Sequence, residues 1–264
     1  MSLDLEAKNS TLNEGAEEET EGVLPEREEE EAEPESPVSE EDSKELREMT
    51  EAGLFFGRKK TKTHPRMKPF ILTTRNGVEI LDLMKTIEQI NKAIGFLKEI
   101  NVKGGKVLLV GTQPAAREAV MKMANDFSFP YVTNKWVGGV LTNFNVIRKR
   151  VDKYIKLKED KESGRLAKYN KKEMSKINRE MDKMNFLFSG VEKMTAAPEA
   201  ILLINPREHM TAIREAKILG IPTVAILSSD NDPELVDYPI VANDNAEKSI
   251  GFVLEKIGEG IKKV

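Results

Sequence analysis

The stretch from Asn134 to Arg150 reads NKWVGGVLTNFNVIRKR and contains residue types from which proteins build contacts to phosphate groups. It holds the only Trp of the chain, Trp136, followed by Gly138, Gly139 and a basic run. Glycines let the backbone approach a ligand closely, and Lys and Arg neutralise phosphate charge. Enzymes place such residues around a bound phosphate, whereas nucleic-acid-binding proteins place them along a sugar-phosphate backbone. The stretch alone leaves both possibilities open.

A second basic segment, RKKTKTHPRMK, lies earlier in the chain, from Arg58 to Lys68. RNA is recognised largely through backbone shape and stacking, so clustered cations beside aromatic residues are typical of RNA-binding surfaces. We therefore predict that both segments contact nucleic acid. The predicted contact residues are Arg58, Lys59, Lys60, Lys62, Arg66, Lys68, Lys135, Asn143, Arg148, Lys149 and Arg150.

Most residues that catalysis or metal binding would need are missing. The chain has no Cys, and its two histidines, His64 and His209, lie far apart in the sequence. The turn after KVLLV carries one glycine, Gly111, and lacks the dinucleotide-binding and Walker patterns. The acids of SSDNDPE, residues 228–234, could hold magnesium, but the pattern is more typical of an Asx turn. We predict no catalytic residue, no metal site and no cofactor.

The formal net charge of −4 conceals two oppositely charged parts. Residues 1–50 hold 19 acidic and 4 basic side chains, which leaves 26 acidic and 37 basic ones for the rest of the chain. The first part is also rich in Pro, Ser and Gly, which predicts a disordered acidic N-terminal tail over residues 1–45. The basic remainder, residues 46–264, is predicted to form one folded domain that binds nucleic acid.

The location of the protein is predicted from what the sequence lacks. No apolar run is long enough to span a membrane, and the N-terminus does not have the basic-then-apolar order of a secretory signal. The lack of Cys fits a reducing compartment. We expect a soluble cytoplasmic protein.

An alternation of strands and helices must position the candidate residues. Continuous apolar runs, followed by helical stretches, are typical of strands buried on both faces of a parallel sheet. The pattern predicts an α/β fold with a doubly wound parallel sheet. The predicted strands lie at 106–111, 130–133, 200–205, 223–228 and 238–243.

The segment before these strands has three local signals. SKELREMTEAGLFFG predicts a short amphipathic helix that ends at Gly53 or Gly57. Asn76-Gly77 between two β-rich runs predicts a hairpin. Apolar residues from Leu83 to Leu97, spaced by four and three, predict a helix with one buried stripe.

One segment interrupts the alternation. Apolar residues recur at intervals of three and four from Val140 to Tyr154, and again from Met174 to Phe188 after a polar turn. Two such stripes predict an antiparallel coiled-coil hairpin at about 141–195. Each arm of 18–20 residues would reach about 30 Å, so the hairpin should protrude from the sheet. Residues 148–193 carry 15 basic and 8 acidic side chains, which favours a nucleic-acid contact.

The sequence also resembles a known family. The motifs EAGLFFGRKKTKTHPRMKPFI, NGVEILDLMKT, VLLVGTQPAAREAV, NKWVGGVLTNF and EAKILGIPTVAIL…NDPELVDYPIVANDNA match, in order, those of bacterial small-subunit ribosomal protein S-two. The resemblance covers about residues 49–258, and the Trp-x-Gly-Gly-x-Leu-Thr-Asn element is specific to that family. The acidic tail lies outside it.

The resemblance implies a flavodoxin-like sheet with a protruding coiled-coil hairpin, bound to small-subunit ribosomal RNA between head and body. It implies a structural role in translation, no catalysis, no small-molecule substrate, and contacts with neighbouring small-subunit proteins, among them the messenger-binding protein S-one. Members usually read Gly-x-His-Phe-Gly-His where this chain has GLFFGR, so Phe55 and Arg58 replace both histidines. Arg58 is expected to contact a phosphate instead.

Within this resemblance the opening stretch becomes a structural hinge next to an RNA contact. Gly138 and Gly139 let the chain turn from a strand into the hairpin, and Trp136 packs at the junction. Asn143 is expected to cap the first hairpin helix.

Two other functions compete with this interpretation. An enzyme acting on a phosphorylated metabolite would need a concave site at the strand ends near Gly111 and Asp232. A regulator that binds messenger RNA or DNA would need a recognition module, and the sequence shows none.

Overall fold

The computed structural model describes residues 40–168 and 170–262. The predicted disordered tail of residues 1–45 lies outside this range up to residue 39, so its disorder there stays a prediction. Residues 40–45 do not fit the predicted tail, because they form the start of helix α1 (Glu40–Glu51). None of the helices in the described residues has the length and hydrophobicity of a membrane-spanning segment.

A three-stranded antiparallel sheet follows the first helix, α1 (Glu40–Glu51). The helix ends just before Gly53, whose φ of 72° reverses the chain direction. The sheet has the order β1-β3-β2, with β1 at Phe56–Lys59, β2 at Ile71–Arg75 and β3 at Val78–Leu81. Short 3-10 helices, η1 (Lys60–Lys62) and η2 (Pro65–Phe70), connect β1 to β2.

The Asn76-Gly77 turn joins β2 to β3 as predicted. Asn76 has φ 51° and Gly77 has φ 75°, so both central residues are left-handed. This conformation matches the twist of a two-residue hairpin, and Asn-Gly adopts it with little strain. The predicted hairpin is therefore confirmed.

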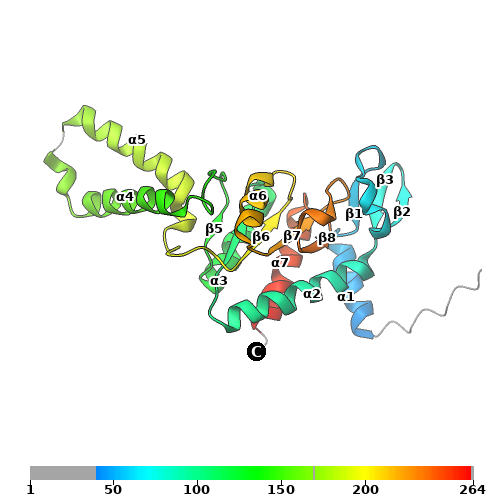
Figure 1. Cartoon of the computed structure of the whole chain (residues 1–264). Helices are drawn as coiled ribbons and strands as arrows, with labels where there is room; N and C mark the ends of the chain where they lie inside the picture. The colour runs from blue at the N-terminus through cyan, green and yellow to red at the C-terminus, as the bar shows by residue number, and fades with distance from the viewer. Residues whose placement is uncertain (1–39, 169, 263–264) are drawn as a thin grey trace, which may run out of the picture. The chain divides into compact units, whose positions relative to one another are not determined.

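The main sheet has five parallel strands in the order β5-β4-β6-β7-β8 (Figure 1). Numbered along the chain, this order is 2-1-3-4-5, which is that of flavodoxin-like folds. All five predicted strands are confirmed. They are β4 (Val107–Val110), β5 (Tyr131–Val132), β6 (Ala200–Ile204), β7 (Thr223–Leu227) and β8 (Tyr238–Val241).

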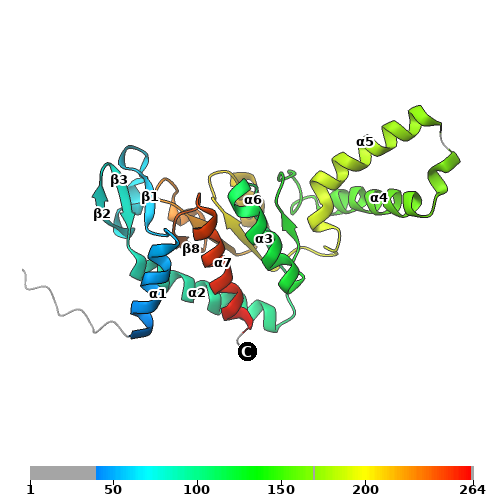
Figure 2. The same cartoon turned by 180° about the vertical axis from the view of Figure 1, so that it is seen from behind.

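One face of this sheet is covered by α2, α3 and α7 (Figure 2). Alternate strand residues such as Leu109 and Leu202 join the same buried cluster as Ile90 of α2 and Val253 of α7. Asp82 caps α2 by accepting from the backbone N–H groups of the first turn, and Pro114 opens α3 as predicted. The three helices are α2 (Leu83–Val102), α3 (Pro114–Phe127) and α7 (Glu247–Lys262).

The opposite face is covered by α6 (Met210–Leu219), by the start of α4 (Phe144–Glu162) and by η2. Leu108 and Leu203 point to this side because side chains alternate along a strand. Here one expectation is wrong, since no α-helix follows β7, only the 3-10 helix η5 (Pro233–Leu235). The connection from β7 to β8 is too short for a helical crossover. Met67 of η2 is fully buried in this cluster. It covers the part of the sheet that a helix after β7 would otherwise cover.

Both edges of the sheet are protected. On β8, the backbone N–H of Val241 donates to the Gln89 side chain over 2.8 Å, and its carbonyl accepts from Thr86 over 2.7 Å. On β5, the 3-10 helix η4 (Ser189–Val191) packs so closely that a Cβ on Gly190 would lie 2.2 Å from the carbonyl oxygen of Tyr131. Such covers prevent pairing with other chains.

The predicted hairpin segment contains two helices, α4 (Phe144–Glu162) and α5 (Lys171–Phe188), which lie side by side (Figure 1). The 3-10 helix η3 (Arg165–Lys168) follows α4. Tyr154 donates its hydroxyl to Asn185 over 2.8 Å. An Asn170–Glu173 capping box begins α5. Ile147 and Val151 of α4 belong to the sheet's second core cluster, so the start of α4 is anchored to the domain.

Candidate nucleic-acid interface

The Trp-Gly-Gly loop between β5 and α4 closes around one buried carboxylate, that of Glu215 on α6. Oε1 accepts hydrogen bonds from Trp136 Nε1 at 3.1 Å and from the Gly139 backbone N at 2.9 Å. Oε2 accepts from the backbone N of Leu141 at 3.1 Å and from both the backbone N and Oγ1 of Thr142 at 3.3 Å. The loop and α6 are therefore joined by a single side chain.

The charge of Glu215 is stabilised by these donors. Burial raises the pKa of its carboxyl, but hydrogen bonds from Gly139, Trp136, Leu141 and Thr142 together lower it by more, so the pKa lies below its usual value. The side chain is 6% exposed, and within the described residues no Lys or Arg forms an ion pair with it. Glu215 is thus an anion held mainly by the loop.

The two glycines of this loop have different roles. Gly139 has φ 90°, which side chains rarely adopt, and an added Cβ would meet that of Asn143 at 3.2 Å. An added Cβ on Gly138 would meet nothing within 4 Å. The geometry of the turn therefore requires a glycine at 139 and not at 138.

Asn143 occupies the N-cap position of α4, as predicted, but the expected side-chain cap is missing. Its side chain makes no capping hydrogen bond, and its φ of −126° and ψ of 43° belong to a turn. Its backbone N donates to the Gly139 carbonyl over 2.9 Å. The turn after Gly139 organises the helix start, which leaves the exposed Asn143 side chain unused.

The cations at the start of α4 divide into two groups. Arg148 donates to the backbone carbonyls of Glu192 and Met194 at 2.9 and 3.0 Å and pairs with Asp152 at 2.7 Å. It therefore ties α4 to the chain that follows α5. Lys149 and Arg150 are exposed, as is Lys135 in the loop, and none of the three forms an ion pair within the described part of the chain.

The cations of the first basic segment, Arg58 to Lys68, also divide into those that form ion pairs and those that do not. Arg66 pairs with Asp232 at 2.6 Å and with Glu234 at 3.1 Å. The remaining lysines are exposed and have no ion-pair partner among the described residues. They are Lys59, Lys60, Lys62 and Lys68.

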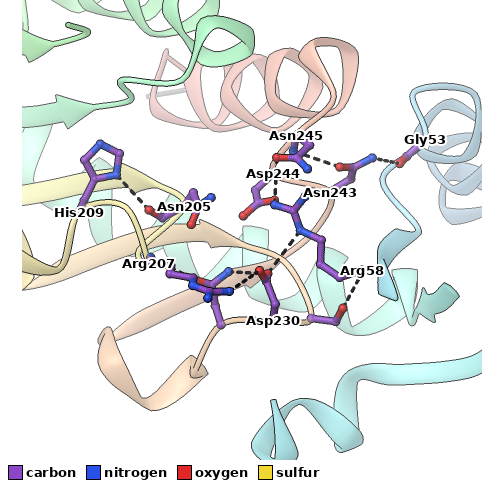
Figure 3. Close-up of polar contacts among 11 residues, drawn as sticks. Gly53, Arg58, Asn205, Arg207, His209, Asp230, Asn243, Asp244 and Asn245 are labelled. Atoms are coloured by element: carbon purple, nitrogen blue, oxygen red, sulfur yellow. Dashed lines mark hydrogen bonds and ion pairs between the residues drawn. The ribbon is translucent and has the colours of Figure 1, made fainter. Parts of the chain in front are cut away.

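Arg58 lies in a charge cluster at the carboxyl ends of β7 and β8 (Figure 3). Its guanidinium pairs with Asp244 at 2.7 Å and with Asp230 at 3.4 Å, and it donates to Asn245 at 2.9 Å. Arg207 reaches Asp230 from the other side, at 3.3 Å. The charge of Arg58 is therefore largely compensated inside the protein.

Asp244 has an unusual environment in this cluster. It is fully buried, and its Oδ2 has no hydrogen-bond partner. Burial raises the pKa of Asp244 to about 7, against the attraction of Arg58 and with the added repulsion of Asp230. The cluster thus holds a carboxyl that takes up a proton near neutral pH.

Gly111 and His209 lie near the strand ends, where an enzyme of this fold would bind its substrate, and both have a structural role. A Cβ on Gly111 would lie 3.0 Å from Ala116, Val120 and Ile204, so this glycine serves helix–strand packing. His209 is buried, its Nδ1 lies 3.0 Å from the Asn205 carbonyl oxygen, and burial lowers its pKa.

The acidic turn after β7 is structural as well. Asp232 caps η5 by accepting from the backbone N of Glu234, which confirms the predicted Asx turn. No group of three or more His, Asp or Glu side chains suited to a metal ion occurs in the described residues.

Comparison with known proteins decides the family. The model of the family "Ribosomal protein S2" matches residues 49–263. The chain is 41% identical to the small ribosomal subunit protein uS2 of Coprothermobacter proteolyticus over 82% of its length and 81% of that protein. Two uS2 proteins of Dehalococcoides mccartyi strains are 35% and 36% identical over 82% of this chain and 88% of theirs. The chain belongs to the ribosomal protein S2 family. The resemblance seen in the sequence is confirmed.

Two residues of this S2 family member were not among the predicted site residues. Glu215 occupies the buried stripe of α6 together with Ala212 and Ala216, and an acid in an apolar stripe was a readable signal. Asp244 gave no such signal, because a short polar run after a strand looks like an ordinary loop. Only the tertiary structure brings Asp244 to Arg58.

Proposed function

We propose that this chain is a structural protein of the small ribosomal subunit that binds small-subunit ribosomal RNA and supports translation. Family membership supports a ribosomal and non-enzymatic role. The single structural observation behind the RNA contact is a set of exposed cations with no ion-pair partner in the described part of the chain. They are Lys59, Lys60, Lys62, Lys68, Lys135, Lys149 and Arg150.

The partly compensated arginines are weaker candidates for this contact. Arg58, Arg66 and Arg148 each form ion pairs with carboxylates of the same domain. A phosphate would have to compete with these partners, so the lysines are expected to supply most of the affinity. Asn143 remains a candidate because its side chain is exposed and makes no capping bond.

We also infer that α4 and α5 form the protruding antiparallel coiled-coil hairpin. The predicted apolar stripes include Ile147, Val151, Met181 and Phe188, which are all buried. Lys153 of α4 pairs with Glu180 of α5 across the two helices. In this proposal the arm presents basic side chains to RNA.

Membership in the small subunit would also account for the expected cytoplasmic location and for contacts with neighbouring ribosomal proteins. The contact with the messenger-binding protein S-one stays a prediction from the family resemblance.

The decisive experiment is sedimentation of the tagged protein with ribosomal particles in a sucrose gradient. We expect it in the small-subunit fraction at low and moderate salt. Recovery only at the top of the gradient would refute the proposal.

A binding titration tests the contact residues. Lys149→Gln with Arg150→Gln removes two exposed charges and keeps helix propensity nearly constant. The slope of log affinity against log salt should fall by about 0.7–0.9 for each phosphate that the variant no longer neutralises. The thermal midpoint should hardly move. Arg148→Gln is the contrasting variant, since it breaks the hydrogen bonds to the two carbonyls and should lower the midpoint.

A further inference from the structure

We propose that Glu215 is the positioning residue of the RNA interface. Its carboxylate sets the conformation of the loop that carries Lys135 and Asn143 and that starts α4. The inference rests on the proposed function, because it assigns Glu215 a part in binding the same RNA. Glu215 itself does not touch RNA, since it is buried beneath the loop.

The hydrogen bonds of Glu215 determine the path of the loop. The loop donors come from Trp136, Gly139, Leu141 and Thr142, which spread over most of the chain between β5 and α4. A buried carboxylate needs its hydrogen bonds, because burying an unsatisfied charge is strongly unfavourable. Each donor is therefore held at a defined place, and the positive φ of Gly139 follows from the same turn.

The position of the exposed cations depends on this turn. Lys135 directly precedes Trp136, and Asn143 directly follows Thr142, so hydrogen-bonded neighbours fix both. The turn also sets where α4 begins, and Lys149 and Arg150 lie within its first two turns. If the loop loosened, all these charged side chains would remain, but their positions would no longer match those of the RNA phosphates.

Because Glu215 is charged, replacing it distinguishes a positioning role from an effect of overall charge. Glu215→Gln removes one negative charge from a protein that binds a polyanion. If only the overall field mattered, the variant would bind RNA more tightly. Positioning predicts the opposite, because the Gln amide can replace only one of the two acceptor oxygens and faces N–H donors with its own N–H₂ group.

The experiment compares Glu215→Gln with Glu118→Gln, a matched change at an exposed site on α3. Each full-length variant is titrated with small-subunit ribosomal RNA at several salt concentrations. We expect Glu215→Gln to weaken binding by about tenfold, a factor of the same size as the cost of leaving one buried donor unsatisfied, and to reduce the salt slope. Glu118→Gln should bind as the wild type or slightly more tightly.

Trp136 reports on the loop directly, because it is the only Trp of the chain. Its fluorescence should shift to the red in Glu215→Gln and stay unchanged in Glu118→Gln. A second control, Val253→Ala in the opposite core cluster, lowers stability without touching the loop. That variant should keep the wild-type salt slope at temperatures where it is folded.

Trp136→Phe covers the case in which Glu215→Gln does not fold. It keeps most of the ring's bulk and removes only one donor, so RNA binding should weaken by less than in Glu215→Gln. Wild-type affinity and salt slope in every folded loop variant would overturn the inference. If the wild-type protein itself does not bind the RNA, the proposed function fails instead.

Discussion

At the scale of single residues, Gly139 shows how backbone geometry limits the sequence. Its φ of 90° is strained for any residue with a side chain, whereas Gly138 has open space around it. We expect Gly139→Ala to lower the free energy of unfolding by about 1–2 kcal/mol. Gly138→Ala should change it by no more than about 0.5 kcal/mol. Urea denaturation of both variants measures the difference, and equal effects would show that the turn tolerates a side chain at 139.

Asp244 predicts a pH dependence of stability. Its pKa is raised from 3.8 in the unfolded chain to about 7 in the fold. Between these values the native state holds a proton that the unfolded state has released, so stability falls as pH rises. The free energy of unfolding of the wild type, relative to Asp244→Asn, should therefore be higher at pH 5 than at pH 8.

Urea denaturation of the wild type and of Asp244→Asn at both pH values measures this difference. All other titrating groups are the same in the two proteins, so their contributions cancel. A difference between wild type and variant that does not change with pH would mean that Arg58 keeps Asp244 ionised throughout.

At the scale of elements, the covered edge strand β5 depends on one glycine. The would-be Cβ of Gly190 lies 2.2 Å from the Tyr131 carbonyl oxygen, so any side chain pushes η4 away from the strand. We expect Gly190→Ala to destabilise the protein by about 1–3 kcal/mol, as overpacking does. Gly95→Ala is the matched control, since Gly95 is exposed within α2 with open space around it.

The control should stabilise the protein by up to about 1 kcal/mol, because Ala has the higher helix propensity. Thermal melts of both variants show whether each change lowers or raises the melting temperature. If Gly190→Ala melts at or above the wild-type midpoint, η4 is free to move off β5, and the tight contact is not needed.

At the scale of the whole molecule, charge is divided between the N-terminal residues and the rest. Residues 1–39 hold 14 acidic and 2 basic side chains. An acidic segment repels RNA, so its deletion should tighten binding to small-subunit ribosomal RNA, most clearly at low salt, where screening is weak. Titrations of the full chain and of the truncated chain at two salt concentrations test this. Equal affinities at low salt would mean that the acidic segment stays clear of the RNA.

Much of the fold could be predicted because its signals are local. The alternation of strand-like and helical segments identified all five strands of the main sheet, and Asn76-Gly77 identified the hairpin of the small one. The absence of a helix after β7 could not be predicted in this way, because Met67, far away in the sequence, covers the surface that a helix would cover. The family resemblance could be recognised from the sequence because its motifs combine particular residue types in a fixed order.

The candidate interface was only partly predictable, for a physical reason. The sequence by itself determined which residues are cationic, that the domain is basic, and that Trp136 and Gly139 lie at a turn. Only the tertiary structure decided which cations are free of internal partners among the described residues, because the ion-pair partners of Arg58 and Arg66 lie far from them in the sequence. Arg58 and Asp244 are 186 positions apart, and Gly139 and Glu215 are 76 positions apart. Periodicity reports which face of an element is buried, but the partner of a buried charge depends on how the elements pack.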